Sequence, residues 1–148
     1  WQAWDAPEHA WPVTMLSPME AVAAAKGQSL RASEELDRAL RRAFWAESRC
    51  ISLRHVILEA AGECESVDVG ALAEALDSGR ARRVILDDWA VARGDEVRGS
   101  AHLFAPDGTH DQNPGITIGW SDDGGAGRYT VEADDPSAID ELVRRAAG

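Results

Sequence analysis

The fold is decided by one stretch of the sequence, which reads Val97-Arg98-Gly99-Ser100-Ala101-His102-Leu103-Phe104-Ala105-Pro106-Asp107-Gly108-Thr109-His110-Asp111-Gln112-Asn113-Pro114-Gly115. Residues 102–105 form a short, mainly apolar run that predicts a strand. Pro106-Asp107-Gly108 ends that run as a turn, because proline presets φ and glycine accepts a positive φ. Asn113-Pro114-Gly115 predicts a second turn, and Ile116-Thr117-Ile118 alternates as a strand does. We therefore expect two strands joined by a polar loop.

The composition is that of an acidic globular protein. The chain has 148 residues, 45% of them hydrophobic and 28% charged, which is enough for one domain with a real core. Its formal net charge of −11 repels phosphate backbones, which excludes general nucleic-acid binding. No apolar run is long enough to span a bilayer, and no secretory signal is visible. We expect no nucleic-acid partner, no membrane partner and a cytoplasmic location.

Helical periodicity predicts a series of short helices before the opening stretch. Ser17, Ser33 and Ser52 are expected to cap three of them, with Glu20 completing a capping box at the first. Apolar residues recur at i, i+3 and i+4, which predicts one buried stripe per helix. The stripes are Leu36, Ala39, Leu40, Ala43 and Phe44 in the second helix and Leu53, Val56, Ile57 and Ala60 in the third. A final helix is expected from about Arg80 to Ala92, with Val84, Ile85, Trp89 and Ala92 on its apolar face.

The first sixteen residues are rich in tryptophan. Trp1, Trp4 and Trp11 lie among prolines, a composition too aromatic for a disordered tail and too interrupted for a helix. We expect an extended segment that packs against another surface. An exposed tryptophan cluster of this kind also allows self-association.

Two cysteines and one polar loop are the candidates for chemistry. Cys50 and Cys64 have neither the Cys-x-x-Cys nor the zinc-knuckle spacing, and the acids flanking Cys64 disfavour its thiolate. We expect neither cysteine to be catalytic, and a disulfide between them is left open. A second candidate is a loop of oxygen and imidazole donors, which also form turns by default and lack the spacing of an EF-hand: Asp107, His110, Asp111 and Asn113. We expect no metal and no cofactor.

The segment from Val97 to Phe104, followed by a turn with Asp107-Gly108, resembles the second half of a DsbA-like thioredoxin domain. That family carries Val-x-Gly-Ser/Thr-Pro-x-x-Phe there, and its proline is cis and lies beside a redox Cys-x-x-Cys. Ala101 stands where the family has proline, and a cis bond before another residue type costs about 2.5–4 kcal/mol. The sequence therefore argues against the cis geometry here. The runs 44–58 and 71–77 resemble the helical subdomain that this family inserts into its thioredoxin fold.

The resemblance implies an α/β, thioredoxin-like (DsbA-like) fold with an inserted α-helical subdomain. The N-terminal β-α-β unit and its Cys-x-x-Cys are absent from this chain and expected upstream of it. The chain would be a fragment of a single domain. Its expected parts are a lead-in at residues 1–16, the helical subdomain and connecting helix at 17–93, and a β-β-α part at 97–148.

The resemblance also implies a function and a site. We expect part of a thiol–disulfide oxidoreductase, which exchanges disulfides with a protein or small-thiol substrate. The chain alone would be inactive, with no catalytic residue of its own. Its contribution would be a substrate groove at Gly99, Ser100, Ala101 and His102. His102 alternatively points at solvent, since strand residues alternate between faces.

Two other functions stay open at this point. The first is a non-catalytic interaction module that kept the scaffold and lost the cysteines, which fits Ala101. The second is a glutathione-dependent isomerase or transferase resembling the kappa class. An upstream serine in place of the first redox cysteine would favour the second.

Overall fold

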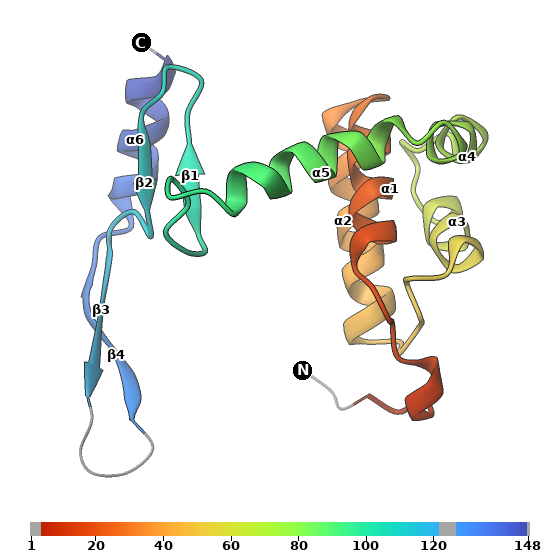
Figure 1. Ribbon diagram of the computed structural model, residues 1–148, viewed down its shortest axis with the longest axis horizontal. Helices are drawn as coiled ribbons and strands as arrows, with labels where there is room; N and C mark the ends of the chain where they lie inside the picture. The colour runs from red at the N-terminus through yellow and green to blue at the C-terminus, as the bar shows by residue number, and fades with distance from the viewer. Residues whose placement is uncertain (1–3, 122–126, 148) are drawn as a thin grey trace. The chain divides into compact units, whose positions relative to one another are not determined.

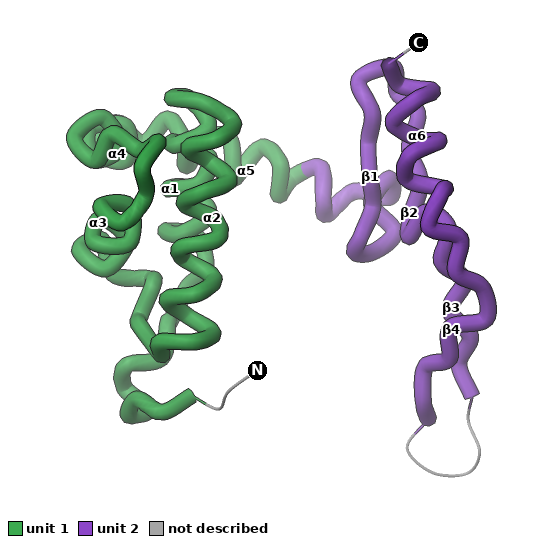
Figure 2. Tube along the Cα trace, turned by 180° about the vertical axis from the view of Figure 1, so that it is seen from behind, with its two compact units in different colours: residues 1–90 green, residues 91–148 purple. Residues whose placement is uncertain are grey.

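The computed structural model describes residues 4–121 and 127–147 (Figure 1). Over these residues the chain is mixed α/β, with six α-helices and two two-stranded antiparallel sheets. It divides into two compact units, residues 1–90 and 91–148, and each is described by itself (Figure 2). Within the described ranges no helix is long and apolar enough to cross a membrane. The single domain expected from the sequence stays a prediction.

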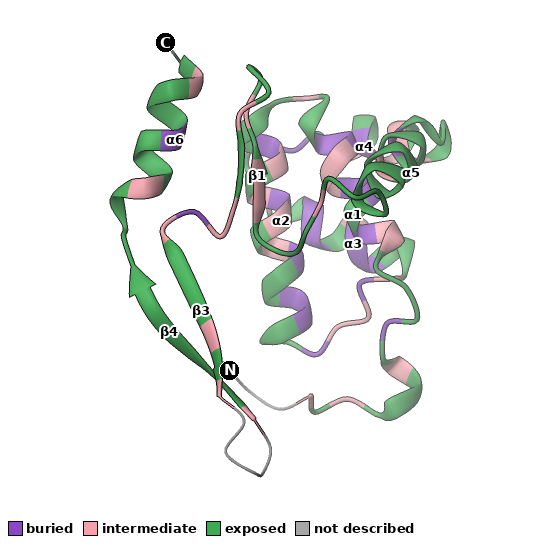
Figure 3. Cartoon of the chain, turned by 60° about the vertical axis from the view of Figure 1, so that its left-hand side comes forward, coloured by how far each residue is buried: buried purple, intermediate pink, exposed green. Residues whose placement is uncertain are grey.

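The first unit is a helical bundle. Its elements are a short 3-10 helix η1 (Glu8–Ala10), α1 (Leu16–Lys26), α2 (Leu30–Trp45), α3 (Arg54–Gly62), α4 (Val69–Asp77) and α5 (Arg80–Ala92), whose last two residues belong to the second unit. Helix α1 packs against α2, α3 and α4, and the buried positions of these helices form the core (Figure 3). The core cluster of buried residues has sixteen members, eight of them alanines.

The predicted stripes of α2 and α3 are confirmed except at Ala39, which is half-buried, and at Leu53. In α2 the four residues Leu36, Leu40, Ala43 and Phe44 are buried, and in α3 the same holds for Val56, Ile57 and Ala60. Leu53 was expected to be buried, and this was wrong: its side chain is 45% exposed. The reason is that Leu53 precedes the first turn of α3 with extended backbone, so it does not share the helix's inward face. The predicted apolar face of α5 was wrong, because Val84, Trp89 and Ala92 are exposed.

The predicted caps were wrong for all three helices. Ser29 caps α2, where its Oγ accepts a hydrogen bond from the N–H of Ala32 at 2.9 Å. Ser33 lies one turn further on and donates to the carbonyl of Val22, which links α2 to α1. Ser17 lies inside α1, which begins at Leu16. Ser52 contacts the Cys50 thiol and makes no cap bond.

Glu20 has a structural role in place of the predicted capping box. Its carboxylate is 5% exposed and binds the Arg82 guanidinium through two contacts, Nε–Oε1 at 2.6 Å and Nη2–Oε2 at 3.2 Å. The hydrogen bond to Glu20, and then its charge, raise the pKa of Arg82. A buried carboxylate needs such a partner, so this pair fixes α5 to α1.

The tryptophan-rich lead-in packs on the core of its own unit. Trp4 lies 4.8 Å from Trp11 and 5.4 Å from Phe44 between ring centroids, and the N–H of Asp5 donates to Ser48 Oγ. Outside η1, the described residues 4–15 form no helix or strand, and Leu16 already belongs to α1. Trp1 lies outside the described residues. Trp4 and Trp11 both have aromatic partners within the chain, and Trp11, which is 49% exposed while Trp4 is half-buried, is the more accessible described candidate for the predicted self-association.

The second unit contains β1 (His102–Phe104), β2 (His110–Gln112), β3 (Ile116–Ser121), β4 (Arg128–Asp134) and α6 (Ser137–Ala147). Strand β1 pairs with β2, and β3 pairs with β4, both antiparallel. The expectation of a polar loop at residues 110–112 was wrong, because these residues form β2. The strand predicted at 116–118 exists, but it is longer and pairs with β4, not with β1.

Gly115 joins the start of β3 to the start of α6. The N–H of Asp135 donates to the carbonyl of Gly115 at 2.8 Å. Gly115 has φ +79°, and a Cβ there would meet the carbonyl oxygen of Asp135 and lie 2.8 Å from the Cβ of Ala138. Glycine is therefore required at this position for both its backbone conformation and its lack of a side chain.

Candidate functional site

The loop that leads into β1 is held by one asparagine. The N–H of Ala101 donates to Asn113 Oδ1 at 3.0 Å, and the N–H of Asn113 donates to the carbonyl of Ala101 at 2.8 Å. Asn113 has φ +50°, a conformation that asparagine adopts more readily than most residues. Two hydrogen bonds from a single residue thus fix the loop at the end of the β1–β2 hairpin.

The other loop residues lie close to the hairpin or face solvent. Gly99 lies beside the side chain of Gln112, and a Cβ at Gly99 would come within 2.6 Å of Gln112 Nε2. The peptide bond between Ser100 and Ala101 is cis, contrary to the sequence-based argument. Gly99, Ser100 and Ala101 are all exposed.

His102 occupies a cluster of rings on one face of the hairpin. Its Nε2 lies 3.0 Å from Nδ1 of His110, and its ring stacks on Phe104 with centroids 4.3 Å apart. The His110 ring also stacks on Phe104, at 5.4 Å. His102 is half-buried, so the expectation that it simply points at solvent does not describe it.

The hydrogen bonds indicate which ring nitrogen carries the proton when His102 and His110 are neutral. The backbone N–H of Arg98 donates to His102 Nδ1 at 3.3 Å, which places the proton of a neutral His102 on Nε2. That proton is donated to His110 Nδ1, so a neutral His110 carries its own proton on Nε2. The pair therefore offers one further N–H donor, at His110, to a group that binds beside the loop.

The polar turn between β1 and β2 is stabilised by hydrogen bonds within the turn itself. Asp107 accepts hydrogen bonds from the N–H and the hydroxyl of Thr109, both at 2.9 Å, and these bonds hold the pKa of its carboxyl below the ordinary value. Asn113 and His110 have the partners described above. No three His, Cys, Asp or Glu side chains arranged to hold a metal occur within residues 4–121 and 127–147.

The two cysteines lie in the other unit and are both free. The Cys50 thiol contacts the hydroxyl of Ser52 at 3.2 Å, and the Cys64 thiol contacts the carbonyl of Ala60 at 3.5 Å. Burial raises the pKa of Cys64, and the charges of Glu35 and Glu63 add to the effect. The prediction of a disfavoured thiolate at Cys64 is confirmed, although burial is the larger cause.

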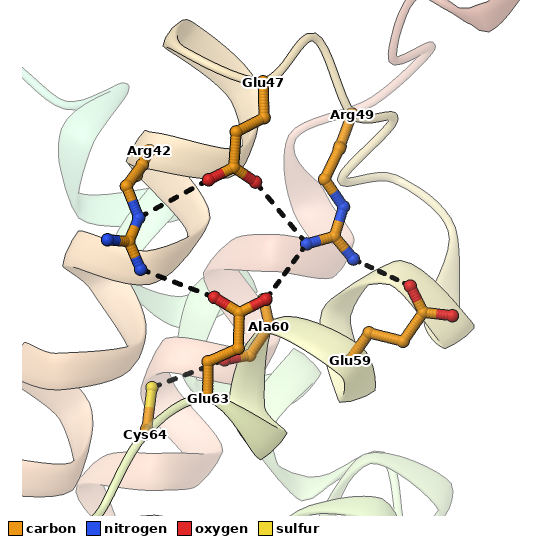
Figure 4. Close-up of polar contacts among 7 residues, drawn as sticks. All are labelled: Arg42, Glu47, Arg49, Glu59, Ala60, Glu63 and Cys64. Carbon is orange, nitrogen blue, oxygen red and sulfur yellow. Dashed lines mark hydrogen bonds and ion pairs between the residues drawn. The ribbon is translucent and has the colours of Figure 1, made fainter.

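Cys64 lies next to a network of charged side chains (Figure 4). Arg42 and Arg49 each contact both Glu47 and Glu63 at 3.4–3.6 Å, and Arg49 also binds Glu59 at 2.7 Å. These residues belong to the end of α2, the following connection and α3. The network therefore holds the α2–α3 connection in place, and each of its charged side chains is paired with another member of the network.

The sequence located the loop but missed the residues that support it. Gly99, Ser100, Ala101 and His102 form one continuous surface with the β1–β2 hairpin. Asn113 and His110 were both considered only as metal donors or turn residues, and not as partners of the loop before β1. The signal for Asn113 in the sequence was weak: asparagine tolerates a positive φ, but a residue before proline usually has extended backbone.

Comparisons with protein-family models and with curated proteins found no match for this chain.

Proposed function

We propose that this chain is part of a DsbA-like thiol–disulfide oxidoreductase, with the redox Cys-x-x-Cys in a segment upstream of Trp1. Its substrate would be a protein or small-molecule thiol or disulfide. Support comes from the resemblance at Val97–Phe104 and from the order of elements: a helical unit, helix α5, a loop, a hairpin and a C-terminal helix. The finer, thioredoxin-like description of the fold is part of this proposal.

The observation that carries the proposal is the fixed and exposed loop before β1. Asn113 holds Ala101 by two hydrogen bonds, while Gly99 and Ser100 stay exposed. Exposed backbone in a fixed conformation can pair with an extended substrate chain, and no side chain is needed for that pairing. Gly99, Ser100 and Ala101 would bind the substrate backbone, and His102 with His110 would border it.

The first test is the coding sequence immediately upstream of Trp1. An in-frame strand followed by Cys-x-x-Cys and a helix would support the proposal, and a start codon directly before Trp1 would overturn it. The full protein would then be assayed for oxidation of a dithiol peptide. Asn113→Ala should lower kcat/KM about ten-fold, because it removes a hydrogen bond that positions the loop. Asp111→Ala is the matched control, since Asp111 is exposed in β2, two residues before Asn113, and pairs opposite Leu103.

A second candidate is a non-catalytic interaction module with the same scaffold. Ala101 favours it, because the proline of the resembling family is missing at a position that would face a substrate. The two candidates differ in the upstream segment: an interaction module would have the strand and helix without the cysteines.

A further inference from the structure

Unit 1 contains an apolar pocket that the proposed function does not use. It lies between α1 and α2 and has a volume of about 450 Å³, within the range of pockets that bind small molecules. Leu40 and Phe44 are buried at its base, and Met15, Met19 and Trp45 line it with roughly half of each side chain exposed. The two methionines are flexible and polarisable, so the pocket can adapt to an alkyl chain.

Three charged side chains line the pocket, and one of them, a cation, is not paired with either of the other two. Arg41 Nε binds Asp37 Oδ2 at 2.7 Å, so these two charges compensate each other. The third charged residue is Lys26, the only lysine in the sequence, at the C-terminal end of α1. Within the part of the chain that the structure describes, Lys26 makes no ion pair. A single free ammonium therefore lines an apolar pocket on a chain of net charge −11.

We propose that this pocket binds a free monocarboxylate with an alkyl chain, such as a medium-chain fatty acid. The alkyl chain would lie against Met15, Met19 and Trp45, and the carboxylate would pair with Lys26. A free acid fits better than a lipid surface, because Lys26 can neutralise its single charge, whereas the many anionic headgroups of a membrane repel a chain of net charge −11. The proposal does not depend on the proposed oxidoreductase function.

The test is calorimetric titration of the full chain with sodium dodecanoate below its micellar concentration. Decanoate should bind more weakly by about four-fold for each methylene removed, the factor that follows from burying one methylene. Dodecyltrimethylammonium has an alkyl chain one methylene longer and the opposite charge, and it should bind more weakly than dodecanoate because its cation would face Lys26. Lys26→Gln should weaken dodecanoate binding by about five-fold, the upper range for an exposed ion pair.

Met19→Glu tests the walls of the pocket, since it places a carboxylate beside the alkyl chain and should abolish binding. Leu30→Glu is the matched control: Leu30 is 73% exposed at the start of α2 and does not line the pocket, so binding should be unchanged. Circular dichroism would verify that each variant folds.

A measurement on the unmodified chain keeps the proposal falsifiable if a variant fails to fold. Acetylation of Lys26 by a small acylating reagent, followed by mass spectrometry, should be slowed more by dodecanoate than by dodecyltrimethylammonium. Equal binding of both amphiphiles, unchanged binding by Met19→Glu, or unprotected Lys26 would overturn the proposal. Binding only to phosphatidylglycerol vesicles, or only to an amphipathic peptide, would overturn it as well.

Discussion

Two glycines with the same backbone conformation should respond very differently to alanine. Gly115 and Gly108 have φ +79° and +86°, so alanine at either adopts a left-handed conformation at a cost of about 1 kcal/mol. A Cβ at Gly108 has no atom within 4 Å, whereas one at Gly115 meets the Asp135 carbonyl and lies 2.8 Å from the Ala138 Cβ. Forcing the backbone apart there adds about 2 kcal/mol, as overpacking does in a core. We therefore expect Gly115→Ala to destabilise unit 2 by about 3 kcal/mol and Gly108→Ala by about 1 kcal/mol.

Tyr129 allows this difference to be measured in unit 2 alone. It is the only tyrosine of the chain and lies in β4, 4.7 Å from the Trp120 ring on β3. Fluorotyrosine labelling therefore gives one ¹⁹F resonance that reports unit 2 during urea titration. Complete unfolding of unit 2 by Gly115→Ala would agree with the argument. Equal destabilisation by both substitutions, within about 0.5 kcal/mol, would refute the close approach of Gly115 to α6.

Three further predictions concern the core, the response to acid and the thiol. Leu72→Ala should lower the unfolding free energy of unit 1 by about 3 kcal/mol and Leu53→Ala by less than about 1 kcal/mol, because Leu72 is fully buried and Leu53 is not; equal effects in urea unfolding followed by circular dichroism would contradict this. Hydrogen bonds from Ser137 hold the pKa of Asp135 below its ordinary 3.8. The contribution of Asp135 to stability is therefore complete above about pH 5 and is lost as the pH falls through the folded-state pKa. Asp135→Asn should make the unfolding free energy of unit 2, followed by the Tyr129 resonance, less dependent on pH in this range. Cys64 should react with iodoacetamide more slowly than free cysteine at about pH 8.5, and Glu63→Gln should speed the reaction, as peptide mass spectrometry would measure.

The helices were the most predictable part of the fold. Helix α5 spans the predicted residues 80–92, and the inward stripe of α2 is buried as expected, since periodicity records which face a helix buries. The predicted caps failed because Ser17 and Ser33 lie inside their helices and Ser52 precedes the N-cap position of α3; of these three helices, a serine side chain caps only α2, and that serine is Ser29. Sequence spacing does not distinguish Ser29 from Ser33.

What depends on distant partners could not be predicted. The carboxylate of Glu20 is bound by Arg82, 62 residues away, and no local pattern encodes such a pair. Strand β2 is three polar residues long, and it exists because the turn at Asp107 brings it against β1. For the candidate site, the resemblance identified Gly99–His102. The contacts that Asn113 and His110 make with this loop could not be predicted, because they depend on the pairing of β1 with β2.

The alanines of unit 1 have a consequence for how its sequence can change. Eight of the sixteen core residues are alanines, so neighbouring helices lie close together with little side-chain volume between them. An alanine at such a site can be replaced only by glycine or by something larger, and larger side chains force tightly packed helices apart. The tolerated substitutions in this bundle should therefore be limited mainly by size, and its alanine positions should vary as little as its leucines. Substitutions would therefore occur mainly on the exposed faces, including the rim of the apolar pocket that contains Lys26.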